Sequence, residues 1–328
     1  MLRDEIIWGF NDISSSGGSS SGGGSGSGGS GSGGSGSGGS SSTTGAMLNK
    51  AKFKQYLKQT DWSDYTPQGY DDGESDDGGS FYPKNVVFTN TNPNVNNDNI
   101  VFKNGKQITI NPVIVSDDPT TEFPGIVYAI VDIASQTLYI YPNKNNTEIY
   151  APEDCGGLFN PTGNNSDEID LYTGFGISSV DCSKLNTSRV TNMEAMFMGC
   201  TSLVKINMAN IDTSKVIHMQ YMFAGIGMGS KPGSYLKMDN WNTNNVLDFG
   251  FMFYSDWFLA TNMDSLNMSS FDFNNKAVLT DMFADTSSTE VKEFSIYVKN
   301  ETYKNRLEAE ARDTTMPAKW VFKVGPSV

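Results

Sequence analysis

The chain has 328 residues and a formal net charge of −14, with 37 acidic residues, 23 basic residues and a single histidine, His218. Phosphate binding needs clustered lysine and arginine, so this balance argues against a nucleic-acid-binding protein. The sequence contains no run of 18 apolar residues. It has three cysteines, and they lack the spacing of a metal site or a disulfide framework. We therefore expect no membrane-spanning helix, no metal and no cofactor, and cysteines that serve as small core residues.

The first 46 residues differ in composition from the rest of the chain. Residues 14–42 contain only serine and glycine, which offer no apolar side chain to bury, and residues 43–46 resemble a cloning scar. We interpret residues 14–46 as an engineered linker that joins a partner peptide, residues 1–13, to a body that begins at Met47. An expression leader is the alternative interpretation of the peptide. Its predicted anchors on the body are apolar residues of the kind found at binding hot spots: Ile7, Trp8 and Phe10.

Residues 47–150 are predicted to form an amino-terminal unit of one helix and a small, mainly β domain. Residues 47–59 place apolar side chains at helical spacing. Residues 85–142 alternate apolar and polar side chains in short runs that predict strands, and Asn104-Gly105 predicts a hairpin turn. The tyrosines of these strands either pack within the sheet or form an exposed binding face: Tyr128, Tyr139 and Tyr141.

An acidic stretch, residues 71–77, lies between this helix and these strands. Carboxylates are suitable calcium ligands, but the ordered ligand positions of an EF-hand loop and its closing glutamate are missing. We therefore expect a solvated acidic loop there.

A repeat with a period near 30 residues occupies most of residues 151–300. Met-Phe pairs start at intervals of 26, 30 and 30 residues, at Met196, Met222, Met252 and Met282. Upstream of each pair, two apolar residues at a spacing of two predict one face of a short strand, and the apolar residues nearer the pair predict one or two helical turns. A single unit cannot bury this strip, so we expect stacked units with one continuous core. The stack predicts that four aromatic rings lie in neighbouring layers: Phe197, Phe223, Phe253 and Phe283.

Residues 212–223, Asp-Thr-Ser-Lys-Val-Ile-His-Met-Gln-Tyr-Met-Phe, resemble the BspA-like (DUF285-type) leucine-rich repeat, in which a strand precedes a D-T-S-x-V-x-x-M-x-x-M-F segment. The copy at 186–197 matches after its first position, and the copies at 242–253 and 272–283 depart from it more. The resemblance covers residues 177–300. It implies an α/β solenoid of strand-plus-helix repeats. It also implies a bacterial surface protein, located at the cell surface or outside the cell, that acts in adhesion rather than catalysis.

Residues 301–328 are predicted to cap the carboxyl-terminal end of the stack. Residues 303–312 predict a helix and residues 319–324 a closing strand. A stacked repeat needs such a terminal unit because its last core layer would otherwise face water.

The residue between the two core positions of each strand is expected to point away from the core. This column includes Ser295 in the last repeat. Together with the column beside it, it supplies the predicted ligand-binding residues: Asp181, Asn207, Lys237, Asp239, Asn267 and Tyr297. Most of these side chains are polar, so a solvated strand face without a ligand is the alternative interpretation.

We expect a non-catalytic module that binds a protein or glycan, with residues 1–13 as a tethered ligand. The alternative is an adhesin at the tip of a phage or virus-like tail fibre, located in the virion tail, in which residues 1–13 form the attachment segment. With one histidine and no phosphate-binding loop, the sequence singles out no nucleophilic or phosphoryl-transfer site. A glycosidase needs only two carboxylates, but no pair stands out.

Overall fold

The structure is a computed structural model and describes residues 45–59, 66–67, 83–95, 99–103, 106–160, 176–209, 211–227, 234–254, 263, 265–284, 293–311, 316 and 319–325. The chain divides into two units, Met1–Ser41 and Ser42–Val328, and every described residue belongs to the second. Several predictions fall on residues outside the described ranges: the peptide anchors Ile7, Trp8 and Phe10, the acidic stretch 71–77 and the hairpin at Asn104-Gly105.

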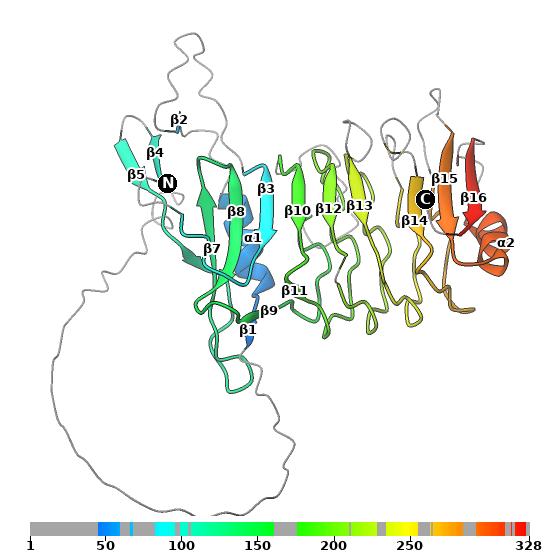
Figure 1. The fold of residues 1–328 in the computed structure, drawn as a ribbon, viewed down its shortest axis with the longest axis horizontal. Helices are drawn as coiled ribbons and strands as arrows, with labels where there is room; N and C mark the ends of the chain where they lie inside the picture. Colours follow the sequence, from blue (N-terminus) through cyan, green and yellow to red (C-terminus); the bar gives the residue numbers. More distant parts are fainter. Residues whose placement is uncertain are drawn as a thin grey trace, which may run out of the picture. The chain divides into compact units, whose positions relative to one another are not determined.

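Seven strands form the largest sheet, in the order β13, β12, β10, β3, β8, β7 and β6. Their bounds are Tyr235–Lys237 (β13), Lys205–Asn207 (β12), Ser179–Asp181 (β10), Asn85–Phe88 (β3), Thr137–Pro142 (β8), Val127–Asp132 (β7) and Val113–Ile114 (β6). The neighbouring pairs β13–β12, β12–β10, β10–β3 and β3–β8 are parallel, whereas β7 pairs antiparallel with both β8 and β6. The predicted domain boundary between residues 150 and 151 is therefore wrong, because strands from both sides of it share one sheet (Figure 1).

Three smaller sheets complete the β structure. The first contains β14 (Ser265–Met268), β15 (Phe294–Val298) and β16 (Trp320–Val324), all parallel. The second contains β1 (Gly45–Met47), β9 (Glu148–Tyr150) and β11 (Leu185–Asn186), also parallel. The third contains β2 (Thr66–Pro67), β4 (Ile100–Lys103) and β5 (Lys106–Thr109), all antiparallel.

Strand β1 shows that the folded body includes Gly45 and Ala46, which precede its predicted start at Met47. Gly45 and Ala46 are buried and pair with Glu148 and Ile149, so the interpretation of these two residues as part of a cloning scar is wrong. A Cβ atom on Gly45 would lie 2.5 Å from the ring of Tyr150, so only glycine fits there without a shift of that ring.

The second half of each repeat is a series of turns, and the predicted helix is absent from these described segments. Equivalent residues in successive units have left-handed backbone, with φ of 52°, 56°, 55° and 52° at Ala195, Tyr221, Phe251 and Asp281. An α-helix does not accommodate such residues. The backbone hydrogen bonds instead join successive units: the N–H of Met193 donates to His218 O at 2.9 Å, and that of Met219 donates to Asp248 O at 3.0 Å.

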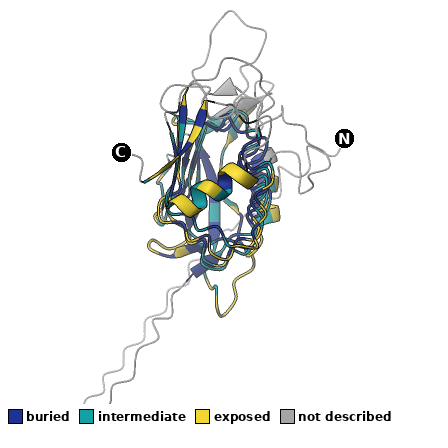
Figure 2. Ribbon diagram, turned by 90° about the vertical axis from the view of Figure 1, so that its right-hand side faces the viewer, coloured by how far each residue is buried: buried dark blue, intermediate teal, exposed yellow. Residues whose placement is uncertain are grey.

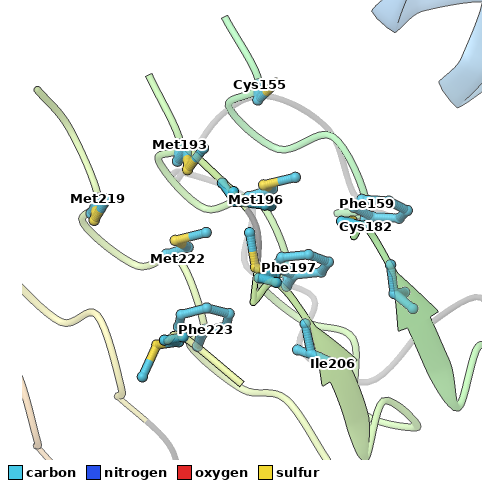
Figure 3. Packing of buried hydrophobic residues seen from close by; sticks show 14 of the residues in the cluster. Cys155, Phe159, Cys182, Met193, Met196, Phe197, Ile206, Met219, Met222 and Phe223 are labelled. Atoms are coloured by element: carbon cyan, nitrogen blue, oxygen red, sulfur yellow. The ribbon is translucent and has the colours of Figure 1, made fainter. Parts of the chain in front are cut away.

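The predicted alignment of phenylalanines is confirmed. Phe197, Phe223, Phe253 and Phe283 stack on one another with ring centroids 5.7, 5.6 and 5.4 Å apart and interplanar angles of 14° or less. Phe159 adds a layer before them, 4.9 Å from Phe197. Figure 3 shows the first three rings of this column, Phe159, Phe197 and Phe223, with the buried methionines of two successive turns and Ile206 of β12.

Buried threonines explain the Asp-Thr-Ser motif. The hydroxyl of Thr187 donates to Asp212 O at 2.9 Å, that of Thr213 to Asn242 O at 3.0 Å, and that of Thr243 to Asp272 O at 2.8 Å. Each threonine thus joins its own unit to the next. The aspartate at the start of the motif shapes the local turn, because the Oδ1 atom of Asp212 accepts the Ser214 N–H at 2.9 Å.

Helices cover both ends of the core. At the amino-terminal end, Phe53 of α1 (Lys50–Gln59) packs on Phe159, with 5.5 Å between ring centroids. At the other end, Arg306 of α2 (Glu301–Glu310) donates to the carbonyl oxygens of Phe273, Asn274 and Ala277 at 3.2, 2.6 and 2.7 Å. The helix and closing strand predicted for the terminal cap are both present, and Figure 2 shows α2 with its exposed side toward the viewer. Neither described helix is long and apolar enough to cross a membrane.

Candidate binding surface

The outer face of the seven-stranded sheet carries a row of side chains that point away from the core. The register aligns these residues across six consecutive strands: Ile130, Tyr139, Val87, Asp181, Asn207 and Lys237. Their chain neighbours Val86, Leu138, Val180 and Ile206 are buried in the core. Since successive side chains of a strand point to opposite faces, the row faces outward.

Three of the six predicted ligand-binding residues, Asp181, Asn207 and Lys237, lie side by side in this row. The Oδ1 atom of Asp181 accepts hydrogen bonds from the Asn207 amide at 3.1 Å and from the Ser183 N–H at 2.8 Å. These contacts hold the turn that follows the strand, so Asp181 has a structural role that needs no ligand. The ammonium group of Lys237 lies 5.3 Å from the ring centre of Tyr235. Because Lys237 is exposed, it is accessible to a partner.

The other predicted residues lie elsewhere. Asn267 and Tyr297 are opposite one another in β14 and β15, a different sheet from that of β13. The predicted alignment of Ser295 with Asn267 is wrong by two residues, because the core row runs from Leu266 to Ile296 and Ser295 pairs with Ser265. Asp239 is exposed in the turn after β13. The predicted column is therefore divided between two sheets.

A cavity of about 400 Å³ lies at the end of the outer face formed by β7 and β8. The segments 92–95 and 109–112 form its rim, and Ile130 and Tyr141 also line it. Ile130 and Tyr141 are buried but do not belong to the main core cluster, which is consistent with their position on the outer side of the sheet. The rim offers the amides of Asn92, Asn94 and Asn111, and no lining residue carries a formal charge at neutral pH.

Tyr141 is the most deeply placed polar side chain of this cavity. Tyr141 is 6 % exposed, less than the other polar residues that line the cavity. Burial, followed by the nearby Tyr128, raises the pKa of Tyr141 above its ordinary value, so the phenol stays protonated and can donate. The rings of Tyr128 and Tyr141 are 5.7 Å apart.

The register therefore places Tyr128, Tyr139 and Tyr141 on the outer face, and not in the main core. Tyr128 and Tyr139 are partly exposed on this face, whereas Tyr141 is buried and its ring packs against that of Tyr128. Sequence reasoning did not find the cavity, because its lining comes from four separate segments that share no periodic pattern.

Other potentially reactive groups do not form a centre. All three cysteines are buried, as predicted, and burial raises the pKa of the Cys155 and Cys200 thiols to about 12, which keeps them protonated. Exposed His218 lies in a row of isolated parallel bridges between Asn192 and Asp248. Among the residues that the structure describes, no group of three His, Cys, Asp or Glu side chains is arranged to hold a metal ion.

Comparison with known proteins gives one similarity. No curated protein and no solved structure matches the chain. A family model described as "Mycoplasma protein of unknown function, DUF285" matches residues 170–297, which include the four Met-Phe repeats. The repeat region of the chain is thus similar to the DUF285 proteins of Mycoplasma, whose function is unknown.

Proposed function

We propose that the chain is the binding module of an adhesin-like bacterial surface protein, that it is not an enzyme, and that it recognises a glycan or a protein through the outer face of its seven-stranded sheet. In this proposal residues 151–300 form a solenoid that contributes β10, β12 and β13 to the face, and residues between 92 and 141 line its cavity. The parallel register between successive units and the DUF285 similarity of residues 170–297 support it.

The cavity beside β7 and β8 is the observation that carries this proposal, and it favours a neutral glycan. Its volume of about 400 Å³ lies within the range of about 300–1,000 Å³ typical of small-ligand sites. The asparagine amides can donate to and accept from sugar hydroxyls, and the Tyr141 hydroxyl can donate to one of them. Ile130 offers an apolar surface for the C–H face of a sugar ring. An uncharged lining gives no partner for an acidic or basic ligand.

A glycan array tests this function with a matched pair of variants. Tyr141→Phe removes only the hydroxyl in the cavity, whereas Tyr128→Phe removes a hydroxyl from a ring that does not line it. We expect neutral glycans to bind, and Tyr141→Phe to weaken binding by about tenfold, the effect of about 1.4 kcal/mol from one lost hydrogen bond. Tyr128→Phe should bind like the wild type. Binding only to acidic glycans, no binding, or equal losses in the two variants would contradict the proposal.

A further inference from the structure

The turns that carry the Met-Phe pairs have a second column of side chains, which points away from the core. We call the four segments 190–199, 216–225, 246–254 and 277–284 the Met-Phe wall. Within it, the equivalent residues with left-handed backbone are Ala195, Tyr221, Phe251 and Asp281. All four are partly exposed and none belongs to the core cluster, although the methionine that follows each of them is buried. Large aromatic residues are uncommon in this backbone conformation.

The two aromatic members of this column stack on each other. The ring centroids of Tyr221 and Phe251 are 4.9 Å apart with an interplanar angle of 2°, and Tyr254 packs edge-on against Phe251 at 6.0 Å. Phe251 therefore has aromatic neighbours on its face and its edge. The preceding layer has Ala195 at the equivalent position, so in the described part of the chain Phe251 is the only ring stacked on Tyr221. Tyr221 is partly exposed, and among the described residues no second aromatic ring stacks on it.

The charges near this ring are carboxylates. Burial is the main cause that raises the pKa of Tyr221. Electrostatic interactions with Asp248, Glu194, Asp281 and Tyr254 raise it further, and no cation is among these groups. Glu194, which directly precedes Ala195, is near enough to raise the pKa of the Tyr221 hydroxyl. A planar cation would gain from both the ring and the carboxylate.

Apolar side chains of the same wall suit a protein partner. Ile217 and Leu247 are 37 % and 40 % exposed, and each lies four residues before a ring of the stacked pair. Val278, in the next layer, is 46 % exposed. They can cover aliphatic parts of a protein segment whose charged group reaches the ring.

We propose that the Met-Phe wall binds an arginine side chain of a protein partner, with the guanidinium group stacked on Tyr221 over Ala195 and paired with Glu194. Arginine suits this place better than lysine because its guanidinium is planar, weakly hydrated and able to form two parallel hydrogen bonds with a carboxylate. The overall charge of −14 also favours a basic partner. This site does not depend on the proposed glycan cavity, which lies on the outer face of the sheet.

Peptide titrations followed by NMR test the ligand class. The isotope-labelled full chain is titrated with N-acetylated, C-amidated Gly-Gly-Arg-Gly-Gly and with the same peptide carrying lysine or citrulline. Citrulline keeps the planar shape of arginine but has no charge. We expect the arginine peptide to shift the amide signals of residues 194–196 and 220–222, at least about fivefold more tightly than the other two peptides and more weakly at high salt. Equal binding of all three, or shifts that map elsewhere, would overturn the proposal, as would stronger shifts of the same signals by N-acetylglucosamine.

Substitutions at one position supply the matched control. Ala195→Phe extends the ring column with a residue type that already occupies this backbone conformation at Phe251, and it should abolish binding of the arginine peptide. Ala195→Ser keeps the position small and should bind like the wild type. Glu194→Gln, a change at a partly exposed residue, should reduce arginine binding to the level of citrulline, and it provides the test if Ala195→Phe does not fold. Unchanged arginine binding in either Ala195→Phe or Glu194→Gln would contradict the proposed site.

Discussion

Replacement of Thr213 by valine should destabilise the protein even though the two side chains have nearly the same shape. Thr213 is 1 % exposed, and its hydroxyl donates to Asn242 O at 3.0 Å and accepts from Asn242 N at 2.8 Å. Valine fills the space but leaves both backbone groups of Asn242 without this partner. A lost partner in a buried place costs about 1–3 kcal/mol, so we expect Thr213→Val to lower the free energy of unfolding by that amount.

Urea unfolding measures this change, with Thr280→Val as the control. Thr280 is exposed, and its replacement should alter the free energy of unfolding by less than about 0.5 kcal/mol. Amide hydrogen exchange gives a local readout, because the Asn242 N–H should exchange faster in Thr213→Val than in the wild type. If Thr213→Val is as stable as the wild type and protects Asn242 equally well, the threonine contacts do not hold successive units together.

Three further substitutions test the core, the cap and the turns. Phe223→Ala opens a cavity in the ring column and should cost about 3–5 kcal/mol in urea unfolding, whereas Phe223→Leu should cost less; equal costs would argue against the stacked column. Arg306→Met removes the donors to three backbone carbonyls and should lower the free energy of unfolding by about 2–3 kcal/mol. Lys304→Met on the same helix should lower it by less than about 1 kcal/mol. A reversed order would contradict the capping role of Arg306. Hydrogen bonds from the side chain and backbone of Ser214 lower the pKa of Asp212, so its contribution is complete above the unfolded-state pKa of about 3.9 and is lost as the pH falls through the lower folded-state pKa. Stability should therefore fall less on acidification in Asp212→Asn than in the wild type, and an identical fall would refute this assignment.

The strict repeat made the inner column of the core predictable. A fixed offset between the Met-Phe pairs and the strand residues placed Phe197, Phe223, Phe253 and Phe283 in successive layers, and the structure places them there. The same spacing led to the wrong local structure. Apolar residues three and four apart suit a helix, but a turn with one left-handed residue puts the same side chains inward. Only the backbone angle at positions such as Tyr221 separates the two possibilities.

Features formed by distant segments could not be predicted in the same way. The cavity beside β7 and β8 joins the segments 92–95 and 109–112 to Ile130 and Tyr141, and nothing in their local sequence requires them to meet. The shared sheet across residue 150 depends on the pairing of β3 with β10, which are 94 residues apart at Asn85 and Ser179. The predicted alignment of Asp181, Asn207 and Lys237 was right because those strands keep the repeat spacing. It failed at Ser295, where the repeat loses its Met-Phe pair.

Adhesion of protein-coated beads to cultured cells tests the proposed recognition most directly. Beads carrying the wild-type chain or Tyr128→Phe should adhere to cells, and enzymatic removal of neutral glycans from the cell surface should abolish adhesion. Beads carrying Tyr141→Phe should adhere about tenfold less well. Adhesion that persists after deglycosylation and is equal for Tyr141→Phe and the wild type would contradict recognition of a glycan in the cavity beside β7 and β8.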